Sequence, residues 1–418
     1  MNSNTINIKS RDLVDYLLVF LLIALSGFPF FTAKRLYLII GLFFALYVFI
    51  SRRKKNNEFY LITIFILSCI IVLQTYIFDY FDIKTQLGLF VRWTFPFIVV
   101  MVVGKKLPEY YINIIYYFAI ISFIFFIPSV LVPGFEKYLL QKWAPIFNQA
   151  VSKDSIYSYN PNIIVYTIKT DAGIRFSNYF RNSGPFWEAG AFAGYTIIAL
   201  MFNMITTKKL INKKNIIFLL AIASTFSTAG FLGVSVLLFS YLVILKKDRN
   251  GWLMVPIILW LSMNIFTNVK IVNYKLTNEM DRLEKRVTSG KRSRVVSAML
   301  DLKTINKNLL FGTGRNDIIR FGREVKTWRE HRNNGITDFA VKYGVPFFCF
   351  YFYFIYCSIK KYLIDNERNQ YFAIYAMAVI FIIGSAETYF QQSFFISMFY
   401  MHLVSNNRVW PFFRNVKI

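Results

Sequence analysis

A basic segment between residues 268 and 335 concentrates the side chains best suited to bind an anion. It also holds His331, one of only two histidines in the 418 residues. A guanidinium presents a planar fork of donors that matches a phosphate or carboxylate group. The composition therefore predicts that this segment handles something anionic. Its nine arginines are Arg282, Arg286, Arg292, Arg294, Arg315, Arg320, Arg323, Arg329 and Arg332.

The spacing of these arginines suggests how some of them are grouped. Arg282 and Arg286 are four residues apart, so a helix over 278–288 would place them on one face. Arg292 stands just ahead of a second helix that we expect over 295–302. The alternative for each arginine taken singly is a solvated basic surface.

A second candidate motif lies ahead of another apolar stretch. Arg181 and Glu188 flank a turn that Gly184 and Pro185 predict. Backbone N–H groups at a helix start are unpaired and attract anions, and a preceding arginine can bind a phosphate. The alternative is an interfacial turn that Trp187 anchors in the membrane surface.

His331 is the leading candidate for acid–base chemistry, because histidine titrates near neutral pH. It stands just before an apolar stretch, at the membrane surface, and the alternative is an ordinary loop histidine. Arg92 and Glu387 stand near the outer ends of apolar stretches. Charges there either mark a site or pathway, or reach out to the surface.

The stretch Leu310–Arg315 (LFGTGR) has the glycines of a phosphate-binding loop but not the rest of that motif. It lacks the GK[ST] ending and a preceding strand. We therefore predict a turn and no nucleotide site.

Composition places the chain in a membrane. It is 56% hydrophobic and 19% aromatic, which a soluble protein of this length would expose to water. The alternation typical of a transmembrane barrel is missing, so we predict an all-α integral membrane protein. Basic cytoplasmic connections explain the net charge of +26 better than nucleic acid does. Three cysteines in apolar runs and two histidines predict no metal site, and we expect no cofactor.

About twelve apolar stretches are candidates to cross a bilayer, which takes roughly 17 to 25 residues. The region 215–246 could instead be one bent helix, which would invert everything after it. The expected spans are 12–32, 36–51, 59–78, 87–103, 109–131, 187–206, 215–230, 232–246, 252–267, 337–359, 371–386 and 389–404.

Lysine and arginine set the expected orientation. If the N-terminus is cytoplasmic, the basic clusters alternate with short outer connections that carry few positive charges. Both termini are then cytoplasmic, and 215–246 is two spans. We expect one polytopic domain over 1–418 with two long extracytoplasmic loops, 132–186 and 268–336. The basic clusters lie at 52–55, 105–106, 208–214, 246–249 and 360–368.

Four features occur in a characteristic order. Arg181–Gly184 (RNSG) precedes a span, and Ser289–Arg292 (SGKR) is followed by a short helix and Leu310–Gly314 (LFGTG). His331–Asn333 (HRN) precedes a span that contains Gly344, and the layout has about twelve spans with two long outer loops. Between about residues 175 and 390, the chain thereby resembles the O-antigen polymerase and ligase superfamily, which comprises the Wzy-type polymerases and their ligase relatives.

The resemblance implies a GT-C-like helical glycosyltransferase in the bacterial inner membrane. It would take a glycan from an undecaprenyl-pyrophosphate donor at the outer face. It would transfer this glycan, with inversion, to the end of another lipid-linked repeat unit of an O-antigen or capsule. Chain-length control would rest with a separate regulator.

The resemblance also implies residue roles. Arg181 and Arg292 would bind the pyrophosphate, with Arg282 and Arg286 in support, because Arg forks stabilise the leaving group without a metal. The base would be His331 or, second, Glu188. The acceptor side would involve Asn333, Arg332 and Glu387.

Two other functions use similar features. A ligase that moves the glycan onto lipid A core would recognise the donor in the same way. A lipid-linked oligosaccharide flippase, which is no enzyme, also has about twelve or more spans. Flippases place their charges in a central cavity, whereas here they gather in two outer loops, which favours the enzyme.

Overall fold

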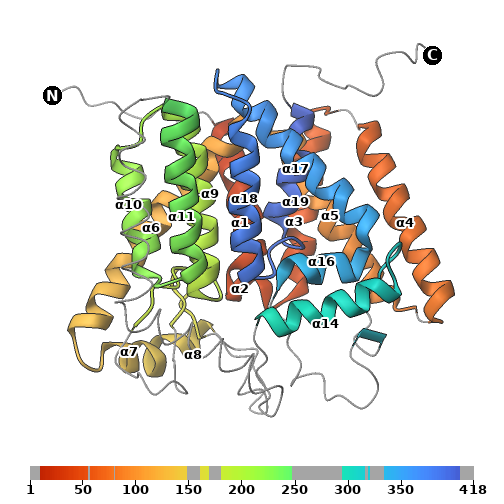
Figure 1. Ribbon diagram of the computed structural model, residues 1–418. Coiled ribbons are helices and arrows are strands. Elements are labelled where there is room, and N and C mark those ends of the chain that lie inside the picture. Colours follow the sequence, from red (N-terminus) through yellow and green to blue (C-terminus); the bar gives the residue numbers. More distant parts are fainter. Residues whose placement is uncertain are drawn as a thin grey trace.

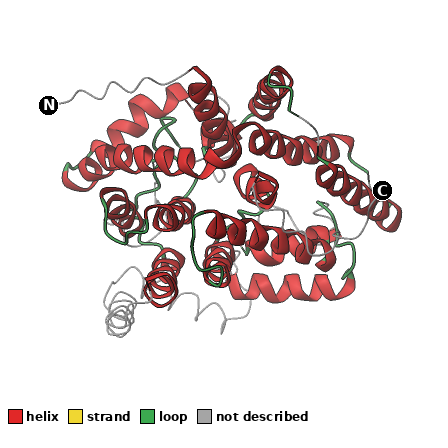
Figure 2. Cartoon of the chain, turned by 90° about the horizontal axis from the view of Figure 1, so that it is seen from above, coloured by secondary structure: helices red, strands yellow, loops and turns green. Residues whose placement is uncertain are grey.

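The computed structural model describes residues 10–54, 57–79, 81–147, 161–168, 180–246, 294–315, 319–320 and 334–404. Within these ranges the chain is helical and forms no strand, apart from one isolated bridge between Asn162 and Thr167. Figure 1 shows the helices packed side by side, and Figure 2 shows the same arrangement from above. The predicted all-helical class is confirmed for the part described.

The helices follow the expected apolar stretches closely along most of the chain. Short 3₁₀ or π segments extend several of them, namely η1 (Gly104–Lys106), η2 (Leu139–Trp143), η3 (Tyr241–Lys246) and η5 (Met401–Val404). The α-helices are α1 (Ser10–Gly27), α2 (Pro29–Thr32), α3 (Arg35–Ser51), α4 (Glu58–Phe78), α5 (Ile83–Val103), α6 (Leu107–Leu131), α7 (Phe135–Tyr138), α8 (Ala144–Phe147), α9 (Ala189–Thr207), α10 (Lys213–Ser224), α11 (Thr228–Ser240), α14 (Arg294–Lys307), α16 (Gly335–Tyr343), α17 (Val345–Asp365), α18 (Phe372–Ala386) and α19 (Ser393–Tyr400).

Five helical runs in the described residues are long and apolar enough to cross a membrane. Three shorter apolar helices accompany them, namely Arg35–Ser51, Phe372–Ala386 and Ser393–Val404. The fold is thus consistent with an all-α membrane protein, while the expected span at 252–267 lies outside the described residues. The five runs are Glu58–Phe78, Ile83–Leu131, Ala189–Thr207, Thr228–Lys246 and Val345–Asp365.

Several expected spans have different boundaries in the structure. The 215–246 region is two helices, as predicted, but it divides at residues 225–227 rather than after Gly230. The cause is Ser227, whose side chain caps α11 by accepting a bond from Gly230 N at 3.2 Å. The expected span 337–359 is two helices, because Gly344 between them has a φ of +82°.

Burial separates an inner helix from outer ones. Helix α9 is buried almost throughout, from Ala191 to Ile205. Helices α3, α4 and α6 instead expose large apolar side chains, including Phe65 at 69% and Tyr76 at 86%. Such a surface would be costly in water and fits a lipid-facing position.

The basic connections gather at one end of the bundle. One ion pair joins the turn after α3 to α1. Two others join the η1 segment to α1 and to α17. Another pair joins the turn after α9 to the end of α17. The pairs are Arg52–Asp15, Lys106–Asp12, Lys105–Asp365 and Lys208–Glu367.

The opposite end carries the predicted site residues that the structure describes, namely Arg181, Glu188 and Glu387. Trp187 N donates a hydrogen bond to Gly27 O, at 3.2 Å, where α1 ends. Helices α7, α8, α14 and α16 lie at this end, along the lower edge of Figure 1. The two ends of the bundle therefore differ in character.

Candidate functional site

Asn182 fixes the turn that presents Arg181. Its side chain is buried and donates to the hydroxyl oxygens of Ser122, at 2.9 Å, and Ser224, at 3.0 Å. Its carbonyl oxygen accepts a bond from Gly184 N, at 3.0 Å. The turn is thereby tied to both α6 and α10.

Gly184 is required by this turn. It has a φ of +50°, and a Cβ there would lie 2.9 Å from the ring of Phe192. A larger residue would have a strained backbone at this φ, and its side chain would clash with the Phe192 ring. Asn182 and Gly184 of the RNSG motif thus shape the turn, and Arg181 is the residue of the motif whose side chain is suited to bind an anion.

Arg181 is oriented by the turn between α10 and α11. Its Nε donates to the backbone oxygen of Thr225, at 2.9 Å, and the side chain is half-buried. A fixed guanidinium loses less entropy when it binds an anion than a mobile one does. This arrangement suits a group that recognises phosphate.

Glu387 lies between the starts of two helices. Its carboxylate accepts a bond from Trp187 Nε1, at 3.4 Å, and a Cβ at Gly190 would lie 2.8 Å from its Oε1. A Cβ at Gly335, the first residue of α16, would lie 2.2 Å from the Glu387 backbone oxygen. Glu188 is the residue immediately before α9 and makes no capping bond with its side chain. Glu387, Glu188 and the start of α16 are thus brought together.

The remaining predicted site residues lie outside the described part of the chain, and their roles stay predictions. His331 precedes Gly335 by four residues in the sequence. Those outside are Arg282, Arg286, Arg292, His331, Arg332 and Asn333.

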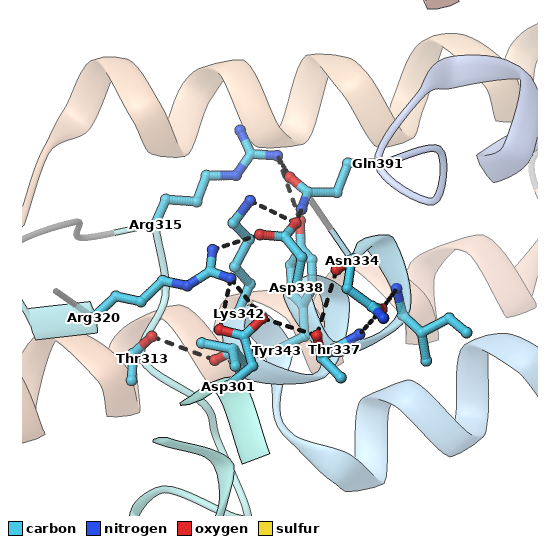
Figure 3. Close-up of polar contacts among 12 residues, drawn as sticks. Asp301, Thr313, Arg315, Arg320, Asn334, Thr337, Asp338, Lys342, Tyr343 and Gln391 are labelled. Carbon is cyan, nitrogen blue, oxygen red and sulfur yellow. Dashed lines mark hydrogen bonds and ion pairs between the residues drawn. The ribbon is translucent and has the colours of Figure 1, made fainter. Parts of the chain in front are cut away.

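A buried ion-pair network joins α14 to α16 (Figure 3). Arg320 binds Asp338 on α16 and both oxygens of Asp301 on α14, the latter at 3.0 and 3.1 Å. Lys342 Nζ donates to Asp338 at 2.8 Å, and Thr337 donates to Asp301 at 2.8 Å. Two positive and two negative charges balance in this network.

The charged states of this network reinforce one another. Burial by itself raises the pKa of Asp338, but Lys342 and Arg320 outweigh it and hold the pKa below its ordinary value. Burial likewise favours neutral Arg320, but Asp338 and Asp301 raise its pKa above the ordinary value. Asp338 and Arg320 therefore stabilise each other in their charged forms, within a network that cross-links the two helices.

Arg315 lies beside this network with a different set of partners. Its guanidinium donates to Gln391 Oε1, at 3.1 Å, and to the Tyr343 hydroxyl, at 3.5 Å. Gln391 in turn donates to Asp338, at 2.9 Å. Figure 3 shows Arg315 reaching over Asp338 toward Gln391. Neither direct partner of Arg315 is an anion.

The Gly-Thr-Gly stretch before Arg315 is a turn, as predicted. Gly312 and Gly314 both have a φ of +67°. The backbone N–H groups of Thr313 and Gly314 donate to α16 carbonyl oxygens, at 2.7 and 3.2 Å. These amides are thus already bonded, which argues against a phosphate-cradling role.

The loop between α18 and α19 connects all these parts. Glu387 begins it, Gln391 holds Arg315, and Tyr389 donates from its hydroxyl to Gly190 O on α9, at 2.8 Å. Glu387, Arg315 and the starts of α9 and α16 are therefore linked through this loop at one end of the bundle. The guanidinium of Arg315 suits recognition of an anion.

Sequence reasoning missed the roles of Asp301, Asp338 and Gln391. Asp338 was a usable signal, because a carboxylate at the start of an apolar stretch needs a partner. Its partner Arg320 is 18 residues away in a different segment, so spacing could not identify it.

Known proteins add no further assignment to this site. No protein-family model, curated protein or solved structure matches the chain.

Proposed function

We propose that this chain is a polymerase of undecaprenyl-pyrophosphate-linked oligosaccharide repeat units. In this proposal the chain has about twelve spans, a GT-C-like fold and both termini in the cytoplasm of a bacterial cell. The polar end of the bundle faces outward, at the level of lipid headgroups.

One observation supports the proposal most. Residues that follow three segments of the family resemblance are far apart in sequence, and the loop between α18 and α19 contacts them at one end of the bundle. Glu387 contacts both Gly190, which follows the Arg181 turn, and Gly335, which follows the HRN motif. Gln391 binds Arg315 at the end of the LFGTG stretch.

The proposed reaction is a single inverting displacement. The acceptor hydroxyl oxygen attacks the anomeric carbon of the donor, and the bond from that carbon to the diphosphate oxygen breaks. His331 takes the hydroxyl proton, with Glu188 as the second candidate. Arg181 and Arg292 stabilise the charge that develops on the departing polyprenyl diphosphate. Neighbouring residues with supporting roles are Arg282, Arg286, Arg332, Asn333 and Glu387.

Deleting the protein tests this proposal through the size distribution of the surface polysaccharide. Gel electrophoresis of the extracted glycan should show a single repeat unit in place of a ladder. Polymer that persists on its lipid carrier would point to a ligase instead. Lipid-linked units trapped on the cytoplasmic side would point to a flippase and would contradict the proposal.

A further inference from the structure

We propose that Arg92 and Arg315 form a second binding site, for the phosphate or diphosphate group of a membrane lipid. Arg92 lies on α5, and Arg315 lies in the turn that follows α14. The two guanidinium groups are within electrostatic reach of each other, and exposed Arg35 is also within reach of Arg92. The proposed function assigns no role to these residues, and the site does not depend on that function.

The counter-charge for these arginines is missing from the described part of the chain. There, Arg92 has no ion pair, and its electrostatic neighbours are Arg315, Arg35 and the Tyr343 hydroxyl. Arg315 meets only neutral oxygens, and its Nε is buried without a hydrogen-bond partner. Asp338 cannot serve, because Arg320 and Lys342 already bind both of its oxygens.

The position of Arg92 makes this missing counter-charge costly. It lies inside the apolar run Ile83–Leu131, next to the buried Trp93. A charge within such a run is expensive unless it is compensated, and charges retained there usually serve a function. Two neighbouring guanidinium groups also repel each other. A bound phosphate would remove both penalties, because it would lie between two positive forks.

A polar hollow adjoins Arg315 and suits the group next to a phosphate. It lies between the end of α4 and the start of α5. Thr85 lines it, and Arg92 follows Thr85 by seven residues, which places both on one face of α5. Besides Arg315, the hollow is lined by the apolar side chains of Phe78 and Ile319 and by neutral amides and hydroxyls, namely those of Gln74, Thr75, Thr85, Gln86 and Thr313.

A lipid is the source of phosphate that fits these surroundings. The last turns of α4 expose Val72 at 65% and Tyr76 at 86%, so apolar surface adjoins the polar hollow on the same helix. A headgroup in the hollow would then have its hydrocarbon chain along α4. A free phosphate would use the arginines but not this apolar face.

Direct binding to the purified full-length protein tests the site. The protein would be kept in a detergent that carries no phosphate group, and undecaprenyl diphosphate would be titrated and counted by native mass spectrometry. Inorganic pyrophosphate would be titrated in parallel. The variants are Arg92→Gln, Arg315→Gln, the double variant, and the charge-preserving Arg92→Lys and Arg315→Lys. The matched control is Arg53→Gln, an exposed arginine at the opposite end of the bundle.

We expect each Gln variant to weaken lipid diphosphate binding roughly tenfold and the double variant to weaken it further, because each loses a charged hydrogen-bond donor. The Lys variants should bind better than the Gln variants, and Arg53→Gln should bind like the original protein. Without ligand, Arg92→Gln should melt no lower than the original, since it removes a repulsion. A lower melting temperature would indicate a structural role and contradict the proposal.

Two further results decide the ligand. Equal binding of pyrophosphate, with the same dependence on both arginines, would keep the anion site but overturn its lipid specificity. Lipid diphosphate binding that neither Gln variant changes would overturn the site itself. Because binding is measured without any glycan transfer, failure here is distinguishable from failure of the proposed polymerase activity.

Discussion

Arg320 and Arg181 have different kinds of partner, and we propose a structural role for Arg320 and a binding role for Arg181. Arg320 forms ion pairs with Asp301 and Asp338, which neutralise its charge inside the protein. Arg181 Nε donates to a neutral backbone oxygen, that of Thr225. The type of partner, rather than burial alone, separates the two roles.

Replacing Arg320 by Met should destabilise the protein strongly. The change leaves two buried carboxylates without their shared cation, which costs about 3 to 5 kcal/mol in comparable buried pairs. The free energy of unfolding in detergent would measure this. Lys303→Met is the control, because Lys303 lies exposed on α14, the helix that carries Asp301. Equal stability of the two variants would contradict the network's role.

The contribution of Asp338 to the stability of the fold should decrease as the pH falls. Because its folded-state pKa lies below the ordinary 3.8, its ionised form stabilises the fold above that pH. This contribution is lost as the pH falls through the lower folded-state pKa. The difference in melting temperature between the original protein and Asp338→Asn should therefore be full at neutral pH and shrink in acid. A difference that stays constant down to strong acid would contradict this.

Arg181→Ala should reduce chain extension by roughly 100-fold or more, since one preorganised group at a developing charge is worth that much. Arg181→Lys should recover only part of the activity, because it lacks both the fork and the Nε bond to Thr225. Arg292→Ala and His331→Ala should also abolish extension, with normal insertion into the membrane. The control is Arg53→Gln, and long glycans from all three Ala variants would refute these assignments.

At the scale of elements, the start of α16 is positioned by close backbone contact with the end of α18. Gly335 allows this contact, because a Cβ there would also lie 2.7 Å from Gly384 O. Asn334 caps the helix by accepting bonds from Ile336 N and Thr337 N, at 3.1 and 3.2 Å. The helix that follows the HRN motif thus has a fixed place.

Gly335→Ala should lower both stability and glycan extension. Alanine favours helices over glycine, so propensity alone predicts a gain. The contact with Glu387 O should outweigh that gain and cost roughly 1 to 3 kcal/mol. Gly88→Ala is the matched control, since a Cβ there meets nothing within 4 Å. If the Gly335→Ala protein were more stable and fully active, the proposed need for close contact between α16 and the end of α18 would be contradicted.

The sequence predicted helices better than it predicted their ends and contacts. Apolar length located most of the described helices, because that signal is local. The division at residues 225–227 depends on the Ser227 cap, so hydropathy placed it a few residues too late. The break at Gly344 depends on backbone conformation, so hydropathy did not predict it. The site motif at Arg181 was predictable as a turn. Its junction with Glu387 was not, because that contact spans about 200 residues of sequence.

At the scale of the whole molecule, the two ends of the bundle carry different chemistry. One end gathers the basic connections and their ion pairs with α1 and α17. The other holds Arg315 and the Trp187–Glu387 contact at the loop between α18 and α19. Positive connections favour the cytoplasmic side, so the polar site should face outward.

Cysteine labelling should confirm this sidedness. After replacement of Cys69, Cys349 and Cys357, a single cysteine at exposed Lys209 should react only from the cytoplasmic side. One at exposed Lys303 should react from the outside of intact spheroplasts. A membrane-impermeant maleimide reports both. Reaction of both positions from the same side would contradict the arrangement.

The most direct test of the polymerase assignment uses purified protein alone. Lipid-linked repeat units extracted from the deletion strain would be reconstituted with it in liposomes containing a metal chelator. The account predicts a ladder of lipid-linked glycans of increasing length, and no ladder with Arg181→Ala. Repeat units that cross the bilayer without lengthening, or a ladder that forms only when metal is restored, would contradict it.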